Sequence, residues 1–266
     1  MTRDLHDAVA WVTGGASGIG ATVCRQLAAG GARVVVSDVD VERGETVAAE
    51  VGGLFVSTDV RRPADSTAAV ALAEEAYGRL DLVHLNAGLS TGGMTLDGFD
   101  PATYRRLMDV NLDGVVYGLV AALPALRRAG GGAVVVTSSL SGITPLPGDA
   151  WYAASKHAVV GLVRSVAEPL SADRVTINAI APGFTNTPFI ADLVAVFAAD
   201  GFPLLSATEV AAVVVRLMTG EDTGQVYALQ PGRPVEPYRF RGVPGAGPGQ
   251  PPPSPSQIVS GDVMRG

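Results

Sequence analysis

The chain has 266 residues, of which 47% are hydrophobic and 17% charged, and its formal net charge is −7. This length and composition suffice for a large buried core. The acidic balance argues against a surface for nucleic acid or anionic membrane, so we expect neither as a partner.

The small numbers of cysteines and histidines bear on the expected redox compartment and on metal binding. Cys24 is the only cysteine, so no intramolecular disulfide can form and a reducing, cytoplasmic setting is expected. Cys24 lies in an apolar helical stretch, which favours a core role over a nucleophilic one. The three histidines show no ligand spacing, so we predict no metal site. The first residues lack the apolar run of a signal peptide, and no uninterrupted apolar stretch reaches the length of a bilayer span.

Short β-branched runs alternate with longer Ala-rich segments along the chain. Strands are predicted at 8–13, 33–38, 53–58, 80–86, 132–139, 174–180 and 224–229, and helices at 18–29, 41–50, 63–77, 101–129, 152–171 and 208–219. Several of the strands are continuously apolar, which is typical of parallel strands covered on both faces. The pattern predicts an α/β fold, a Rossmann-type doubly wound sheet of about seven parallel strands with helices on both faces.

The C-terminal composition differs from the rest. Residues 242–266 are rich in Gly and Pro and carry too little apolar surface to offset the entropy of ordering. We interpret 1–241 as a single domain and 242–266 as a flexible tail, with wrapping onto a neighbouring subunit as the alternative.

A glycine-rich turn, "VTGGASGIG" at 12–20, follows the first predicted strand and opens the first predicted helix. Gly14, Gly18 and Gly20 allow a tight turn, and the helix N-terminus beyond it presents free N–H groups to a phosphate. Such a turn is a weak signal alone, but its position between strand and helix strengthens it.

Asp38 ends the second predicted strand, 18 residues after Gly20. An acid at this place accepts hydrogen bonds from the adenosine ribose hydroxyls and repels a 2′-phosphate. Val39 follows it, and neither Ala16 nor Ser17 supplies a positive charge in the turn. These residues favour NAD over NADP; the alternative is that Asp38 only caps its own turn.

Tyr152 and Lys156 are four residues apart, which places them on one face of a helix. Such pairs also occur by chance. A positive charge about 4 Å from a phenol would lower its pKa by roughly three units at an effective dielectric near 20, which would make the tyrosine a usable general base.

With these motifs in this order, residues 5–232 resemble the short-chain dehydrogenase/reductase family. Thr13-Gly14-x-x-x-Gly18-x-Gly20 resembles its cofactor turn, Asp59-Val60 its adenine-contacting pair, and Asn86-Ala87-Gly88 its Asn-Ala-Gly element. Asn111, Ser139, Tyr152 and Lys156 resemble its catalytic residues, and the element that begins Pro182-Gly183 resembles its nicotinamide-side segment. The resemblance implies a cofactor-binding set of Gly14, Ser17, Gly18, Ile19, Gly20, Asp38, Asp59, Val60, Asn86, Ala87, Gly88, Tyr152, Lys156, Pro182, Gly183, Thr185 and Thr187.

The resemblance also assigns roles. Tyr152 would exchange a proton with the hydroxyl of a secondary alcohol, Ser139 would orient the substrate oxygen, Lys156 would bind the nicotinamide ribose, and Asn111 would hold a relay water. Ser138 competes with Ser139, but adjacent residues leaving a strand point in opposite directions, and the spacing of 13 residues to Tyr152 selects Ser139. His84 and Leu85 depart from the family pattern, in which another Asn often precedes the Asn-Ala-Gly element, and we interpret them as packing variation.

Residues 183–206 follow the sixth predicted strand, where a lid over the site is expected. Its many Phe, Leu, Ile and Val residues suggest a hydrophobic or cyclic alcohol or ketone as substrate, unless they are ordinary helix core. By resemblance, helices 101–129 and 152–171 would form the interfaces of a homo-oligomer, a tetramer or dimer. The alternatives to a dehydrogenase are an NAD-dependent epimerase or dehydratase and a non-catalytic dinucleotide-binding sensor.

Overall fold

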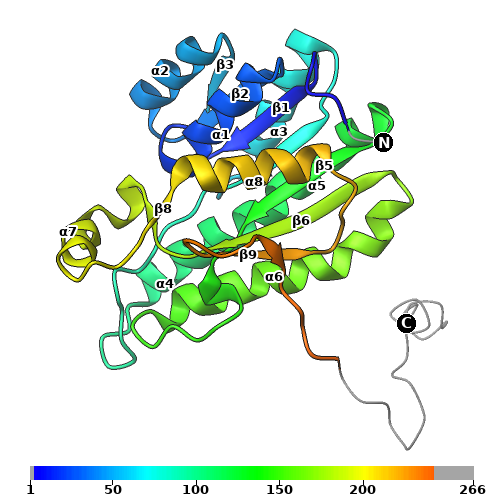
Figure 1. Cartoon of the computed structure of the whole chain (residues 1–266). Coiled ribbons are helices and arrows are strands. Elements are labelled where there is room, and N and C mark those ends of the chain that lie inside the picture. Colours follow the sequence, from blue (N-terminus) through cyan, green and yellow to red (C-terminus); the bar gives the residue numbers. More distant parts are fainter. Residues whose placement is uncertain (1–2, 243–266) are drawn as a thin grey trace, which may run out of the picture.

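The structure, a computed structural model, describes residues 3–242. Within them the main sheet has strand order β10-β9-β6-β5-β4-β1-β2-β3 (Figure 1). Seven of its strands are parallel, as predicted, and the short edge strand β10 runs antiparallel to β9. The bounds are β1 Val9–Thr13, β2 Arg33–Asp38, β3 Leu54–Ser57, β4 Leu82–Leu85, β5 Gly132–Thr137, β6 Val175–Pro182, β9 Val226–Leu229 and β10 Glu236–Pro237.

Helices cover both faces of this sheet, which confirms the doubly wound fold (Figure 1). One face carries α3 (Pro63–Tyr77), α5 (Gly114–Arg128) and α6 (Ala150–Ser171). The other face carries α1 (Gly18–Ala29), α2 (Val41–Val51) and α8 (Ala207–Thr219). The predicted boundaries of these helices differ from the observed ones by at most two residues, except in the segment 101–129.

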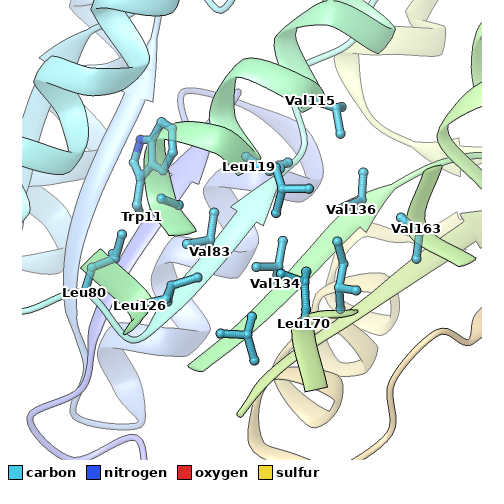
Figure 2. Close-up of a cluster of buried hydrophobic side chains, with 14 of the residues drawn as sticks. Trp11, Leu80, Val83, Val115, Leu119, Leu126, Val134, Val136, Val163 and Leu170 are labelled. Atoms are coloured by element: carbon cyan, nitrogen blue, oxygen red, sulfur yellow. The ribbon is translucent and has the colours of Figure 1, made fainter. Parts of the chain in front are cut away.

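The core lies in two layers, one on each face of the sheet. Figure 2 shows the layer under α3, α5 and α6, where Trp11, Val83 and Val134 point from neighbouring strands toward Leu119 and Leu126 of α5. Cys24 is fully buried in the other layer, and burial raises the pKa of its thiol to about 12. The expected core role of Cys24 is therefore met, since a buried neutral thiol is a poor nucleophile.

The segment predicted as one helix at 101–129 has three parts. These are α4 (Pro101–Met108), a π-helical turn (Asp109–Asp113) and α5. Together they are long and apolar enough to cross a membrane by length and composition alone, although charged residues interrupt them, so that they contain no uninterrupted apolar stretch of that length. However, Val115, Leu119 and Leu126 are buried against the sheet, so this segment packs as a core-covering helix of the fold.

The predicted lid, 183–206, contains elements that the sequence did not indicate. It holds β7 (Thr185–Asn186), a 3₁₀ turn (Pro188–Ile190), α7 (Ala191–Ala199) and β8 (Leu205–Ser206). Strands β7 and β8 pair with each other and close the base of the segment, while α7 projects from the body of the molecule (Figure 1). The predicted tail at 242–266 lies, apart from Gly242, outside the described residues.

Candidate active site

The glycine turn between β1 and α1 has the backbone that its glycines predict. Gly14 and Gly18 have φ angles of +63° and +53°, which other residues rarely adopt. A Cβ at Gly20 would overlap the carbonyl oxygen of Gly14. Ser17 precedes the first turn of α1, its side chain makes no capping bond, and no acidic residue lies in that turn, which includes Ile19. The positive end of the α1 dipole is thus left open for an anion.

Asp38 lies at the carboxyl end of β2 and is bonded to the glycine turn. Its Oδ2 accepts from the Ala16 N–H at 3.0 Å, and its Oδ1 accepts from the Asp40 N–H at 3.0 Å. The second bond is the turn cap that we held as the alternative. Since a carboxylate has further acceptor sites, this cap leaves the predicted ribose contact open.

The Asp59-Val60 pair after β3 is engaged within the protein. Arg61 binds the Asp59 carboxylate with an Nη2–Oδ2 distance of 2.6 Å, and this bonding lowers the pKa of Asp59. Val60 is buried, and a Cβ on Gly114 would approach its Cγ2 to 2.8 Å. The adenine contact of this pair stays a prediction.

Asn86-Ala87-Gly88 joins the end of β4 to the glycine turn. Thr13 Oγ1 accepts from the N–H groups of Asn86 (2.9 Å) and Ala87 (3.2 Å), and Asn86 Nδ2 donates to the carbonyls of Thr13 (3.2 Å) and Gly14 (3.3 Å). A Cβ on Gly88 would lie 3.3 Å from Lys156 Nζ. The element therefore supports the turn and passes beside the lysine.

His84 extends this network into the sheet. It is fully buried, and its Nε2 lies 2.9 Å from Thr137 Oγ1, which donates to Asn86 Oδ1 at 3.0 Å. Nε2 must therefore carry the proton, and Nδ1 has no partner among the described residues. Burial lowers the pKa of His84 to about 3. His84 is a polar supporting residue and not merely an apolar packing variant, whereas Leu85 is buried in the core as expected.

Asn111 lies in the π-helical turn between α4 and α5, a kind of irregularity common at functional sites. Its Oδ1 accepts from the Leu89 N–H at 2.8 Å, and its Nδ2 donates to the Leu89 carbonyl at 2.8 Å and to Ser155 Oγ at 3.1 Å. One amide hydrogen thus holds the chain after Gly88, and the other binds Ser155 of α6. A relay water, as the resemblance implies, would have to use the second lone pair of Oδ1.

The two adjacent serines after β5 face different surroundings. Ser138 is buried and its hydroxyl donates to the Lys156 carbonyl at 3.1 Å. The Ser139 side chain accepts from the Ser141 N–H at 3.1 Å and is hydrogen-bonded to Tyr152. Ser139, the residue selected by spacing, is therefore the one that the structure brings to the phenol.

Tyr152 and Lys156 share one face of α6, as predicted, with Lys156 Nζ lying 5.7 Å from the centroid of the Tyr152 ring. Lys156 is buried, donates to the Thr137 carbonyl at 3.0 Å, and has its pKa lowered to about 8 by burial. Tyr152 is partly exposed.

The expected lowering of the Tyr152 pKa is wrong for the chain's own groups. Burial raises the pKa of Tyr152 to about 12, the hydrogen bond with Ser139 lowers it, and the charge of Asp149 raises it. We predicted the lowering for a lysine close to the phenol oxygen and neglected desolvation, which is the larger effect here.

The segment after β6 comes back to the glycine turn. A Cβ on Gly18 would lie 3.2 Å from Thr187 Cβ, so this threonine faces the turn across the site. Thr187 Oγ1 donates to the Thr185 carbonyl at 3.2 Å, and Thr185 Oγ1 to the Gly183 carbonyl at 3.0 Å. Pro182, the last residue of β6, pairs with Leu229 of β9. All four predicted residues of this segment thus lie at the carboxyl end of the sheet.

The lid places aromatic rings beside the phenol. The Phe189 ring lies 6.2 Å from that of Tyr152, and Phe184, Phe197 and Phe202 form a separate cluster with centroids 4.4 to 6.0 Å apart. No residue of α7 is buried. The apolar residues of α7 are therefore not domain core, whereas Leu205 at the end of the lid is buried in the core, so each interpretation holds for part of this segment.

Asp149 is a site residue that the sequence reasoning missed. It is the N-cap of α6, which begins two residues earlier than predicted, and its carboxylate accepts from the Tyr152 N–H at 3.1 Å. An Asp three residues before the tyrosine is an ordinary N-cap signal and could have been recognised.

Comparisons with known proteins agree with this geometry. A profile of the family described as short chain dehydrogenase matches residues 8–195. A cyclohexanol dehydrogenase of Acinetobacter sp. (strain SE19) is 34% identical over 242 residues, which cover 86% of this chain and 94% of that protein. A 3-alpha-(or 20-beta)-hydroxysteroid dehydrogenase of Mycobacterium tuberculosis is 38% identical over 190 residues, 71% of this chain and 73% of that one. The structure of a 3-ketoacyl-(acyl-carrier-protein) reductase from Brucella melitensis complexed with NADH has a TM-score of 0.81 at 28% identity and covers 86% of this chain and 99% of that chain.

Proposed function

This chain belongs to the short-chain dehydrogenase family and is an oxidoreductase, and from that premise we propose that it oxidises or forms apolar, cyclic secondary alcohols with NAD(H). The observation that carries the proposal is the meeting of Ser139, Tyr152 and Lys156 beside a cofactor-type glycine turn. A bound nicotinamide would supply the hydride chemistry, as acceptor from a carbinol carbon or as donor to a ketone.

In alcohol oxidation, Tyr152 takes the hydroxyl proton as the C–H bond gives up its hydride; in ketone reduction it donates that proton to the oxygen. Ser139, hydrogen-bonded to the phenol, orients the substrate oxygen and stabilises its developing negative charge. Lys156 is buried, and its ammonium would bind the nicotinamide ribose while its charge favours the phenolate. Asn111 holds the backbone at Leu89 beside this set.

The family uses a nicotinamide dinucleotide, and the residues of the turn fit one. A Cβ on Gly14 or Gly20 would collide with Asn86 or with the turn's own backbone, and a Cβ on Gly18 would crowd Thr187, so glycine is needed for this tight, phosphate-type turn. We propose NAD over NADP because the Asp38 carboxylate would repel a 2′-phosphate at the end of β2, and the exposed Val39 beside it carries no charge to bind one.

The lid supports an apolar substrate. Phe184, Phe189 and Phe202 keep exposed surface on the lid, and residues 183–206 include no Lys or Arg that would bind an anionic group. Two relatives in the same family are named for a cyclohexanol and a hydroxysteroid, both cyclic alcohols. We therefore infer a ring-bearing secondary alcohol or its ketone.

We also propose a homo-oligomeric assembly and a cytoplasmic location. The outward side of α5 leaves Val120 at 63% exposure, which fits a helix face covered by another subunit in a dimer or tetramer. A single buried cysteine fits a reducing, cytoplasmic environment.

The test is a turnover assay with a matched substrate panel. The purified protein is incubated with NAD⁺ and cyclohexanol, a steroid alcohol or a sugar phosphate, and NADH formation is followed. We expect NADH with the cyclic alcohols and none with the sugar phosphate. Binding of NADH without any turnover would indicate a sensor instead, and conversion of substrate without net NADH would indicate an epimerase or dehydratase.

A further inference from the structure

Asp149 is a buried carboxylate with an unusually full set of donors. Its Oδ1 accepts from Thr91 Oγ1 at 2.7 Å and from the Tyr152 N–H at 3.1 Å, and its Oδ2 accepts from Ser90 Oγ at 2.8 Å and from the Thr91 N–H at 3.1 Å. The residue is only 5% exposed. All four groups donate to it, as an ionised carboxylate requires.

These bonds tie the backbone of Tyr152 to the chain after β4 from two directions. On one side Asp149 bonds the Tyr152 N–H and the residues at 90 and 91. On the other side the Tyr152 carbonyl accepts from Ser155 Oγ at 2.7 Å, and Ser155 accepts from Asn111, which holds Leu89. The phenol is therefore carried on a backbone fixed at both its N–H and its carbonyl.

The negative charge of Asp149 has no cationic partner within residues 3–242. Among the described residues no Lys, Arg or His forms an ion pair with it, and its four donors are all neutral. The groups around the Tyr152 side chain are Ser139 from the end of β5, Lys156 from its own helix and Phe189 from the lid, and Asp149 binds the backbone N–H of the same residue. Of these residues only Lys156 and Asp149 are charged. The positive charge of Lys156 favours ionisation of the phenol, and the negative charge of Asp149 opposes it.

We propose that Asp149 is a positioning residue for Tyr152, which fixes its backbone and whose buried negative charge opposes ionisation of the phenol. This inference rests on the proposed function, in which Tyr152 is the proton donor and acceptor. In the protein, Asp149 keeps Tyr152 in the protonated form that ketone reduction needs, so alcohol oxidation requires a more alkaline pH. This expected pH dependence agrees in direction with the effect of the Asp149 charge, which raises the pKa of Tyr152.

The experiment compares two neutral caps, Asp149→Asn and Asp149→Ser, with the wild-type enzyme in the presence of NAD⁺. Both residues are good N-caps, so α6 should persist in either variant. The titration of Tyr152 is followed by the NMR signal of ¹³Cζ-labelled tyrosine, and it is identified among the six tyrosines by its absence in Tyr152→Phe. The pH dependence of kcat with cyclohexanol is measured beside it.

Asp100 supplies the matched control. It is the N-cap of α4 and accepts from Ala102 N–H, Thr103 N–H and Thr103 Oγ1, but it is exposed. We expect both Asp149 variants to move the Tyr152 midpoint and the kcat profile to lower pH by about half a unit or more, because a nearby negative charge has been removed. Asp100→Asn should leave both unchanged.

An unmoved Tyr152 titration in both Asp149 variants would overturn the proposal, even if their thermal stability fell as much as that of Asp100→Asn. The absence of any Tyr152 titration in wild type and variants alike would count against it equally. Turnover of cyclohexanol by Tyr152→Phe at the wild-type rate would instead reject the proposed function, and the NMR titration would still decide the role of Asp149.

Discussion

Ser138 and Ser139 show how much one position matters at the scale of a residue. They are neighbours at the end of β5, but Ser138 bonds the backbone of α6, and Ser139 bonds the phenol of Tyr152. A Cβ on Gly142 would overlap Ser138 Oγ, so the buried hydroxyl also fits closely against the following turn. The first serine supports the site, and we propose that the second contacts the substrate.

Replacing each serine by alanine should separate these roles. We expect Ser139→Ala to reduce kcat about a hundredfold with little change in NAD affinity, because it removes a donor to the developing oxyanion. Ser138→Ala should keep kcat within a few-fold and lower the free energy of unfolding by about 1 kcal/mol, the typical net value of one buried hydrogen bond. Steady-state kinetics and urea unfolding of both variants measure this. A larger loss of kcat in Ser138→Ala would reverse the assignment.

The residue positions of the site could be predicted from sequence, but their energetics could not. Spacing placed Ser139, Tyr152 and Lys156 together because a strand end and one helical face fix where they lie. The direction of the Tyr152 pKa was missed because desolvation depends on every element packed around the phenol. Asp149 was missed because its importance comes from contacts with residues 90 and 91, far away in the sequence.

At the scale of elements, the parallel strands and most helices were predictable from apolar runs and turn residues. The π-helical turn at Asp109–Asp113 was not, because one extra residue in a turn scarcely changes the apolar period of the helix. The lid was expected, but α7 within it was not, since its residues are apolar on all sides and have no polar face to reveal a period.

The lid gives a prediction about substrate affinity. Phe189 is 51% exposed and lies beside the Tyr152 ring. We expect Phe189→Ala to raise KM for cyclohexanol about tenfold with a smaller change in kcat, because an apolar contact of about 1.4 kcal/mol with the substrate is lost. The measurement is steady-state kinetics over a range of cyclohexanol concentrations.

Tyr238→Ala is the control for loss of a partly exposed aromatic ring. Its N–H bonds the Val226 carbonyl at 2.7 Å, and Val226 begins β9 at the end of the sheet away from the site. The KM of the Tyr238→Ala variant for cyclohexanol should match that of wild type. An unchanged KM in Phe189→Ala would show that the substrate does not contact the lid at this ring.

At the scale of the whole molecule, the buried His84 links stability to pH. Its pKa falls from 6.5 to about 3 on folding, so only the unfolded chain takes up this proton between those values. The stabilisation is therefore complete above the unfolded pKa of 6.5 and is lost progressively as the pH falls toward 3. Its size is on the order of 2 kcal/mol at pH 5, at about 1.4 kcal/mol per unit.

His84→Asn should weaken this acid sensitivity. Asparagine can still donate toward Thr137 Oγ1 but takes up no proton. We expect the loss of unfolding free energy between pH 7 and pH 5, measured with urea, to be smaller in the variant by on the order of 2 kcal/mol. His157→Asn, which changes an exposed histidine, is the control and should follow wild type. Equal acid sensitivity of all three proteins would show that His84 titrates normally in the fold.

The account depends most on Tyr152 as the proton donor and acceptor of a nicotinamide-dependent reaction. The most direct measurement is NAD⁺ reduction with cyclohexanol by wild type and Tyr152→Phe, with NAD⁺ affinity determined for both by calorimetry. We predict a loss of turnover of about a thousandfold or more in the variant, with NAD⁺ affinity within threefold of wild type, because only the exchangeable proton is removed. Turnover near the wild-type rate in a variant that binds NAD⁺ would contradict the account.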